Sequence, residues 1–320
     1  MPLRTGLPLR ILEVASHGGY LQEAFRVNGA PTTIVEGSTS WADDARRRGL
    51  AVERTVLDAA AAPRLIERLG GRADAVLDFY LLAHLRDPGS LLLGIRRVLG
   101  ADGFAVVEFD HLLPLIKQRQ FDAIRHGHFS YFSLLAFRAA LDRAGLEVFD
   151  VEKQPVYGGA LRAWLRDARH GPQASTARVE TLLAEERQAG LDRVETYLGF
   201  HEAVELTQQR LRGFLEQARR DGRLVVGYGA PSRCTTLLNS CGITSELLPF
   251  VVDRSPAKQG RSLPGSRIPI REPDALLRAR PDIVLVLTWD LIDEVMAQLP
   301  EVRSWGGRFV VPIPEVSVLP

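Results

Sequence analysis

Cysteine, net charge and long apolar segments are all scarce in this sequence. Cys234 and Cys241 are the only cysteines among 320 residues. They are too few for a disulfide framework or a four-cysteine zinc site, so we expect no structural metal. Lys and Arg number 40 against 39 Asp and Glu, so the formal net charge of +1 offers nothing to attract nucleic acid. No apolar run approaches the roughly 20 residues that span a bilayer, and the N-terminus lacks a signal-peptide pattern. We therefore expect a soluble, cytoplasmic protein without nucleic-acid or membrane partners.

The length and the alternation of strand and helix patterns predict two α/β domains. At 320 residues the chain exceeds what one hydrophobic core usually serves. In the first half, short apolar runs alternate with helical patterns, which indicates βαβ units in a doubly wound, Rossmann-like sheet. The strands expected there are residues 11–15, 32–36, 74–78, 104–109, 145–154 and 159–166. A smaller Rossmann-like pattern follows, with strands expected at residues 224–228, 248–253, 283–287 and 308–313.

A helical segment separates these two halves. Residues 175–222 contain no proline, and their apolar residues recur with helical spacing. We therefore expect domains at residues 1–170 and 223–320, joined by a helical connector at residues 171–222.

Three of the seven histidines, His111, His126 and His128, fall within eighteen residues of one another. Two of them belong to the segment FDAIRHGHFSYFS, residues 121–133, and Asp110 directly precedes the third. Histidine exchanges protons near neutral pH because its ordinary pKa is about 6.5. We interpret the cluster as the site of a general base. Histidines satisfied in the core or at the surface are the alternative.

A glycine-containing loop follows the first expected strand and opens a helix. It reads Ser16-His17-Gly18-Gly19-Tyr20, and glycine lets a backbone approach a ligand closely. Glu36 ends the next expected strand, where an acid accepts hydrogen bonds from a ribose diol. The G-x-G-x-x-G spacing is absent, so NAD is disfavoured and an adenosine without phosphates, as in S-adenosylmethionine (SAM), fits better. A tight turn followed by a surface acid is the structural alternative.

A second loop, GYGAPSRCTT at residues 227–236, also lies between an expected strand and a helix. Backbone N–H groups at a helix N-terminus attract anions, and Arg233 adds a positive charge. Because Pro231 and Cys234 stand where a dinucleotide-binding loop would carry glycine, NAD is disfavoured here too. We expect this loop to bind an anionic group of a small-molecule substrate, with a purely structural loop as the alternative.

Four stretches of the chain together resemble a known enzyme family. They are ILEVASHGGYL, FDAIRHGHFSYFS, GYGAPSRCTTLLNSCGI, and VVDRSPAKQGRSLPGSRIPI with its later partners LTWDL and WGGRFVVPIP. In this order they are similar to the SAM-dependent C-methyltransferases that act on nucleotide-linked keto-deoxysugars in antibiotic biosynthesis. Members of that family typically carry an N-terminal cysteine-rich zinc module, which this sequence lacks. The resemblance implies a SAM-binding methyltransferase domain, SAM as cofactor and a nucleotide-linked sugar as acceptor.

The resemblance also implies roles for individual residues. His128 falls on the family's general base, whereas Arg125 and Gly127 stand where relatives have a tyrosine and a glutamate. The residues expected to contact SAM are Ser16, His17, Gly18, Gly19, Tyr20, Glu36, Asp78, Phe79 and Tyr80. Those expected to contact the acceptor are Tyr228, Ser232, Arg233, Thr235, Arg254, Lys258 and Trp289.

The chemistry implied by the family is methylation of a carbon through an enolate. His128 would remove a proton next to the ketone, with His126 as the competing base and Tyr131 beside them. His111 or Arg125 would stabilise the enolate oxygen, since a preorganised positive charge favours a developing anion.

Two departures from the family keep other functions open. Phe79 and Tyr80 replace a polar pair of the family, and we expect them to form an apolar wall facing the cationic methyl donor. The acid of the glycine loop and the glutamate beside the base are both absent. An enzyme that only moves protons (an isomerase, epimerase or cyclase) and a non-catalytic binding subunit are therefore the alternatives. The sequence leaves the oligomeric state open.

Overall fold

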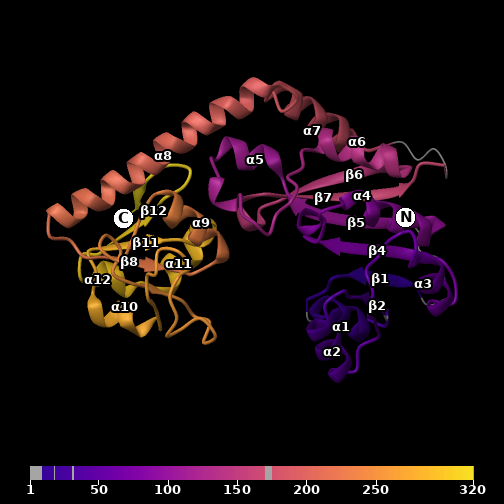
Figure 1. Cartoon of the computed structure of the whole chain (residues 1–320), viewed down its shortest axis with the longest axis horizontal. Coiled ribbons are helices and arrows are strands. Elements are labelled where there is room, and N and C mark those ends of the chain that lie inside the picture. The colour runs from indigo at the N-terminus through magenta and orange to yellow at the C-terminus, as the bar shows by residue number, and fades with distance from the viewer. Residues whose placement is uncertain (1–8, 18, 31, 170–174, 320) are drawn as a thin grey trace. The chain divides into compact units, whose positions relative to one another are not determined.

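A computed structural model describes residues 9–17, 19–30, 32–169 and 175–319. Its contacts divide the chain into two compact units, residues 1–113 with 127–192 and residues 114–126 with 193–320. The predicted boundaries at residues 170 and 222 differ from this division. Helix α7 (Ala177–Gln188) packs on strand β6 (Leu146–Gln154) of the first unit, whereas helix α8 (Val194–Arg220) buries Leu211 and Leu215 in the second (Figure 1).

The first unit is built on a seven-stranded sheet with the order β3-β2-β1-β4-β5-β7-β6. Strands β1 to β5 are parallel, and β7 runs antiparallel between β5 and β6. The doubly wound sheet predicted from the alternating pattern is thereby confirmed. The remaining strands are β1 (Ile11–Val14), β2 (Thr32–Val35), β3 (Val52–Glu53), β4 (Ala73–Phe79), β5 (Leu99–Asp110) and β7 (Ala160–Asp167).

Capping residues mark where two helices of this unit begin and where one of them ends. Asp87 accepts a hydrogen bond from the Ser90 N–H at the start of α4, and Ser133 does the same for the Ala136 N–H of α6. Gly145 ends α6 in the left-handed conformation that glycine adopts without strain. The helices are α1 (Tyr20–Val27), α2 (Thr39–Arg47), α3 (Ala62–Arg68), η1 (Leu82–His84), α4 (Pro88–Val98), α6 (Leu134–Ala144) and η3 (Val156–Gly158).

The second unit contains a six-stranded sheet with the order β10-β9-β8-β11-β12-β13. Five strands are parallel, and β13 pairs antiparallel with β12. Alternate residues of β11 face different cores, because Leu285 packs with α8 and Val284 packs in a separate cluster. The strands are β8 (Val225–Tyr228), β9 (Val251–Val252), β10 (Ile270–Arg271), β11 (Ile283–Val286), β12 (Arg308–Val311) and β13 (Ser317–Leu319).

The segment between β5 and α6 is shared by the two units. Residues 114–126 belong to the second unit, where Phe121 is buried in the core and the turn η2 contacts α9. Residues from 127 onward belong to the first unit, so the segment 121–133 is divided between them. The helices not yet given are α5 (Leu112–Lys117), η2 (Phe121–Ala123), α9 (Ser232–Ser240), α10 (Asp274–Ala279), η4 (Trp289–Leu291), α11 (Ile292–Gln298) and α12 (Glu301–Ser304).

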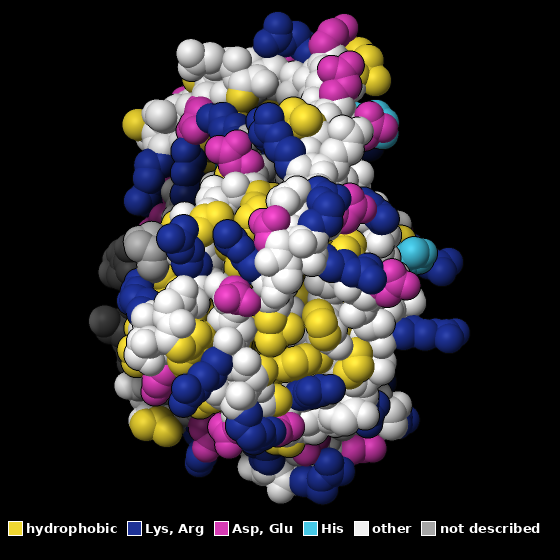
Figure 2. Space-filling view, turned by 90° about the vertical axis from the view of Figure 1, so that its left-hand side faces the viewer, with side chains coloured by type: hydrophobic (Ala, Val, Ile, Leu, Met, Phe, Trp, Pro, Cys, Tyr) yellow, Lys and Arg dark blue, Asp and Glu magenta, His cyan; other side chains and the backbone are white. Residues whose placement is uncertain are grey.

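The face of the molecule drawn in Figure 2 carries charges of both signs. On the face drawn in Figure 2, Lys and Arg side chains are scattered among acidic ones, in keeping with the net charge of +1. Among the described residues, every helix is too short or too polar to cross a membrane.

The packing of α8 leads to a stability prediction. Leu211 is fully buried in the second unit's core, whereas Leu198 on the same helix is 63% exposed. Leu211→Ala should therefore lower the free energy of unfolding of the second unit by about 2–5 kcal/mol. Leu198→Ala should change it by less than about 0.5 kcal/mol. Hydrogen exchange read separately on β4 and β11 would contradict this if both strands lost protection equally in Leu211→Ala.

Candidate functional site

The loop after β1 has an unusual backbone. Ala15, His17 and Gly19 all have positive φ angles, of 51°, 46° and 71°. A Cβ atom on Gly19 would lie 2.3 Å from Leu50 Cδ1, so only glycine fits there. The loop thus turns sharply at the carboxyl end of the sheet before α1 begins at Tyr20. Of the predicted loop residues, Gly18 lies outside the described residues.

Three buried carboxylates lie at the carboxyl ends of neighbouring strands. Glu13 belongs to β1, Glu36 follows β2 and Asp78 belongs to β4, and they are 4%, 4% and 0% exposed. Strand β1 pairs with both β2 and β4, so the chain reverses its winding direction at this point. Ligands of doubly wound sheets bind at such a switch point.

Each of these carboxylates keeps an acceptor oxygen without a hydrogen-bond partner among the described residues. The other oxygen of Glu36 accepts from the Ser38 N–H at 2.8 Å, and that of Asp78 accepts from the Leu81 N–H at 3.0 Å. Buried polar atoms are nearly always satisfied in native proteins. The unfilled oxygens therefore fit a ligand rich in donors, as the ribose hydroxyls and amino groups of SAM are.

Burial also changes the protonation of two of these acids. It raises the pKa of Glu13 to about 7 and that of Asp78 to about 7, although backbone N–H groups at Leu81 and Leu82 oppose the shift for Asp78. Glu36 instead has the ring of His17 nearby, with Nδ1 3.9 Å from Oε2. Glu13 was missed as a separate site residue, although it is the acid of the motif ILEVASHGGYL.

His128 lies in the same unit, close to the end of β5. Its side chain is 6% exposed, and its Nδ1 lies 3.5 Å from Asp110 Oδ2. The His84 ring packs edge-on against it, with centroids 4.7 Å apart, and the Tyr131 ring lies at 5.9 Å. His84 also hydrogen-bonds the carbonyl oxygen of Gly127 through Nδ1. The sequence analysis missed His84.

The acid–imidazole pair expected from Asp110 and His111 is not formed. The two are adjacent at the end of an extended strand, where successive side chains point to opposite faces. His111 is 2% exposed, and its Nε2 lies 2.7 Å from Oε1 of the fully buried Glu186. The same carboxylate accepts hydrogen bonds from the N–H groups of Leu134 and Leu135 at the start of α6. His111 is thus part of a buried structural network.

Two further predictions change with the structure. Arg125 and His126 belong to the second unit, whereas His128 and Tyr131 belong to the first. The face of the Phe79 ring already carries a cation, because the Arg162 guanidinium lies 5.8 Å from its centroid. That face of the Phe79 ring is therefore not open to a methyl donor.

In the second unit, Asp122 bonds two of the residues that were predicted to bind the methyl acceptor. It is fully buried and accepts two hydrogen bonds from Arg233, at 2.8 and 3.2 Å, and one from Trp289 Nε1 at 2.9 Å. The guanidinium also lies 4.7 Å from the centroid of the Trp289 ring. The charge of Arg233 is therefore already paired, and the expectation that it binds a substrate anion is weakened. Asp122 itself was missed, because nothing local marks it as a partner of Arg233.

The other residues predicted to bind the methyl acceptor lie around the carboxyl ends of β8 and β9. Lys258 Nζ lies 3.1 Å from Asp253, which also accepts from the Ala230 and Ser255 N–H groups. Gln298 accepts from Tyr228 Oη at 3.1 Å and from Arg254 at 3.4 Å. The remaining two, in the first turn of α9, are the exposed Ser232 and the half-buried Thr235.

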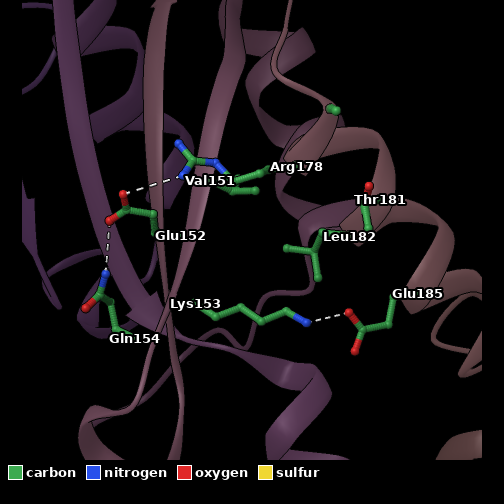
Figure 3. A pocket seen from close by; sticks show the side chains of 9 residues that line it. Val151, Glu152, Lys153, Gln154, Arg178, Thr181, Leu182 and Glu185 are labelled. Atoms are coloured by element: carbon green, nitrogen blue, oxygen red, sulfur yellow. Dashed lines mark hydrogen bonds and ion pairs between the residues drawn. The ribbon is translucent and has the colours of Figure 1, made fainter.

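A cavity of about 460 Å³ lies elsewhere in the first unit, between β6 and α7 (Figure 3). Val151 and Leu182 form its apolar part. Its charged side chains neutralise one another, because Lys153 pairs with Glu185 and Arg178 lies 3.8 Å from Glu152. None of the predicted site residues lines this cavity, so the geometry gives it no role in the site above.

Comparison with known proteins agrees with this architecture. A family model described as the C-methyltransferase C-terminal domain matches residues 155–314, and a methyltransferase domain model matches residues 2–151. C-methyltransferase NovU of Streptomyces niveus is 35% identical over 309 residues, which cover 97% of this chain and 73% of NovU. The chain belongs to the C-methyltransferase family. It is a SAM-dependent C-methyltransferase, and the predicted family, fold and cofactor are confirmed.

Solved structures give only partial likenesses. A Haloferax volcanii complex of a methyltransferase with the Trm112 activator matches at 16% identity and TM-score 0.42, covering 54% of this chain and 87% of that one. The 1,6-didemethyltoxoflavin-N1-methyltransferase of Burkholderia thailandensis matches at 18% and TM-score 0.37, covering 50% and 71%.

The raised pKa of Asp78 predicts a loss of stability as the pH rises. The unfolded chain releases this proton near pH 3.8, whereas the native protein holds it until about pH 7. The native state therefore binds more protons in this window, and its stability falls between about pH 4 and 7. At about 1.4 kcal/mol per pKa unit, the free energy of unfolding of the wild type should fall by about 2–4 kcal/mol over this window. Asp78→Asn should abolish this fall.

Denaturant unfolding at pH 5 and pH 8 measures this effect without any ligand. Asn retains an oxygen that accepts from the Leu81 N–H, so the variant should fold. Asp43→Asn, on the surface of α2, is the matched control and should keep the wild-type pH dependence. Identical pH dependence in wild type and Asp78→Asn would show that the buried carboxyl ionises normally.

Proposed function

We propose that this C-methyltransferase methylates a carbon next to the ketone of a nucleotide-linked keto-deoxysugar, with His128 as the base. The observation that carries the proposal is the pair of the nearly buried His128 and the partly buried Asp110, which lies in the same unit as the three unfilled carboxylates. The acceptor class rests on the four sequence stretches shared with the ketosugar enzymes. Natural-product biosynthesis is the setting that this resemblance favours.

Glu13, Glu36 and Asp78 are the residues that would hold SAM. Their free oxygens accept hydrogen bonds, and the sharp turn at Gly19 brings backbone close to the same strand ends. When bound, SAM supplies an electrophilic methyl group on a cationic sulfur. Because these acceptors are retained and unfilled, we favour methyl transfer over an enzyme that only moves protons.

His128 would act as the proton acceptor for the carbon next to the ketone. Its Nδ1 faces Asp110, so the carboxylate orients the imidazole and stabilises the imidazolium that forms. The nearly buried side chain favours proton transfer away from bulk water. His84, edge-on to the ring and bonded to the Gly127 carbonyl, would hold the base in place.

The second unit's part in acceptor binding rests on fewer free groups. Arg233 and Lys258 are paired with carboxylates, so we assign anion recognition first to Arg254 and to the hydroxyls of Ser232 and Thr235. Among the described residues, Arg254 has only a long, 3.4 Å hydrogen bond to a neutral amide, which leaves its charge without an acidic partner there.

Cofactor binding tests the role of Glu36. Glu36→Gln should weaken SAM binding by about 1–3 kcal/mol in calorimetry, because one amide oxygen replaces two charged acceptors. The amide oxygen can still accept from the Ser38 N–H, so the fold should be retained. Glu23→Gln, on the exposed face of α1, should bind SAM like wild type. Unchanged affinity in Glu36→Gln would remove Glu36 from the cofactor site.

Proton transfer can be followed without methyl transfer. A nucleotide-linked keto-deoxysugar in D₂O should exchange its acidic C–H with wild type in the absence of added SAM. His128→Asn should slow this exchange by about 10²–10⁴-fold and leave SAM affinity nearly unchanged. His126→Asn is the matched control and should have a milder effect. Wild-type exchange by His128→Asn would rule out His128 as the base.

A further inference from the structure

Tyr80 is held in a strained conformation at the end of β4. Its φ of 69° lies in the left-handed region, which side chains other than glycine seldom adopt. Its N–H donates to the Glu108 carbonyl oxygen at 2.8 Å, which ties the strained residue to the neighbouring strand β5. Such strain persists only where the surrounding structure enforces it, and it concentrates at functional sites.

The Tyr80 hydroxyl is buried and is not held by a well-formed hydrogen bond. Its oxygen has no partner of acceptable geometry among the described residues. The Glu108 carboxylate lies nearby, but it accepts a hydrogen bond from Arg162 Nε at 2.8 Å. Burial raises the pKa of the hydroxyl well above its ordinary value, and the charges of Glu108 and Asp110 and the contact with the Glu108 side chain add to the shift. The group therefore stays protonated and remains available as a donor.

The position of Tyr80 connects it to the base. Tyr80 is bonded to β5 at Glu108, and Asp110, two residues further along the same face of that strand, lies 3.5 Å from His128 Nδ1. Tyr80 also packs edge-on against Tyr157, with ring centroids 5.1 Å apart, and this contact restricts the orientation of the Tyr80 ring. A hydrogen-bond donor and a base that share a carboxylate neighbour suit an acceptor ketone and its adjacent C–H bond.

His111, one of the two residues expected to stabilise the enolate oxygen, is buried in its bond to Glu186 and so leaves this role open. We propose that Tyr80, rather than forming an apolar wall, donates the hydrogen bond that stabilises the enolate oxygen of the acceptor. This inference rests on the proposed function. His128 takes the proton from carbon, the electron pair of the C–H bond moves to the carbonyl oxygen, and Tyr80 keeps its own proton throughout.

The test compares Tyr80→Phe with Tyr157→Phe. Both changes remove one hydroxyl, but Tyr157 is 60% exposed and has no assigned part in the chemistry. Exchange of a nucleotide-linked keto-deoxysugar in D₂O should slow by about 10–10³-fold in Tyr80→Phe, as for loss of one oxyanion donor. Tyr157→Phe should exchange near the wild-type rate. SAM affinity should stay within about twofold in both, because neither hydroxyl contacts the cofactor carboxylates.

A stability measurement separates this role from a structural one. Removing a buried hydroxyl that has no partner should leave the melting temperature of Tyr80→Phe equal to or above that of wild type. A lower melting temperature would show that the hydroxyl is bonded within the protein and would overturn the inference. Undiminished exchange by Tyr80→Phe would overturn it while leaving the proposed function intact. Absence of exchange by the wild-type enzyme would overturn the proposed function, and the inference with it.

Discussion

The carboxylate of Glu186 joins the elements that surround the candidate base. It is fully buried, and it bonds His111 at the end of β5 and two N–H groups at the start of α6. A buried charge is tolerated only when it is paired and hydrogen-bonded. These bonds therefore fix the end of β5, and with it Asp110, relative to the segment that runs from His128 into α6. They act together with the hydrogen bond from the Leu112 N–H to the Phe132 carbonyl oxygen, which joins the same two segments.

The buried acids of this unit differ in whether the protein supplies their hydrogen bonds. Glu186 has all its bonds supplied by the protein, whereas Glu13, Glu36 and Asp78 each keep an oxygen with no partner among the described residues. An unfilled buried acceptor costs free energy, so the unit is less stable than one with apolar residues at these positions. A ligand with several donors recovers that cost on binding. The contrast separates a structural acid from a binding acid more clearly than residue type does.

The architecture can be predicted well from the sequence alone because local residue patterns determine it. Apolar runs that alternate with helices indicate both doubly wound sheets, and all ten predicted strands are present. Strands β3, β10 and β13, of two, two and three residues, are too short to show a period and were missed. The site was predicted less well, since its partners lie far apart in the sequence. His111 and Glu186 are separated by 75 residues, and Arg233 and Asp122 by 111.

The segment 121–133 shows why neighbours in sequence need not share an environment. Asp122 at its start is buried in the second unit and pairs with Arg233, whereas His128 six positions later pairs with Asp110 of the first unit. A sequence motif that crosses such a boundary serves two cores with different requirements. Arg125 and Gly127, which stand where relatives have a tyrosine and a glutamate, flank the point where the chain passes from one unit to the other. The backbone carbonyl of Gly127 bonds His84, which packs against His128, so this position supports the base without a glutamate side chain.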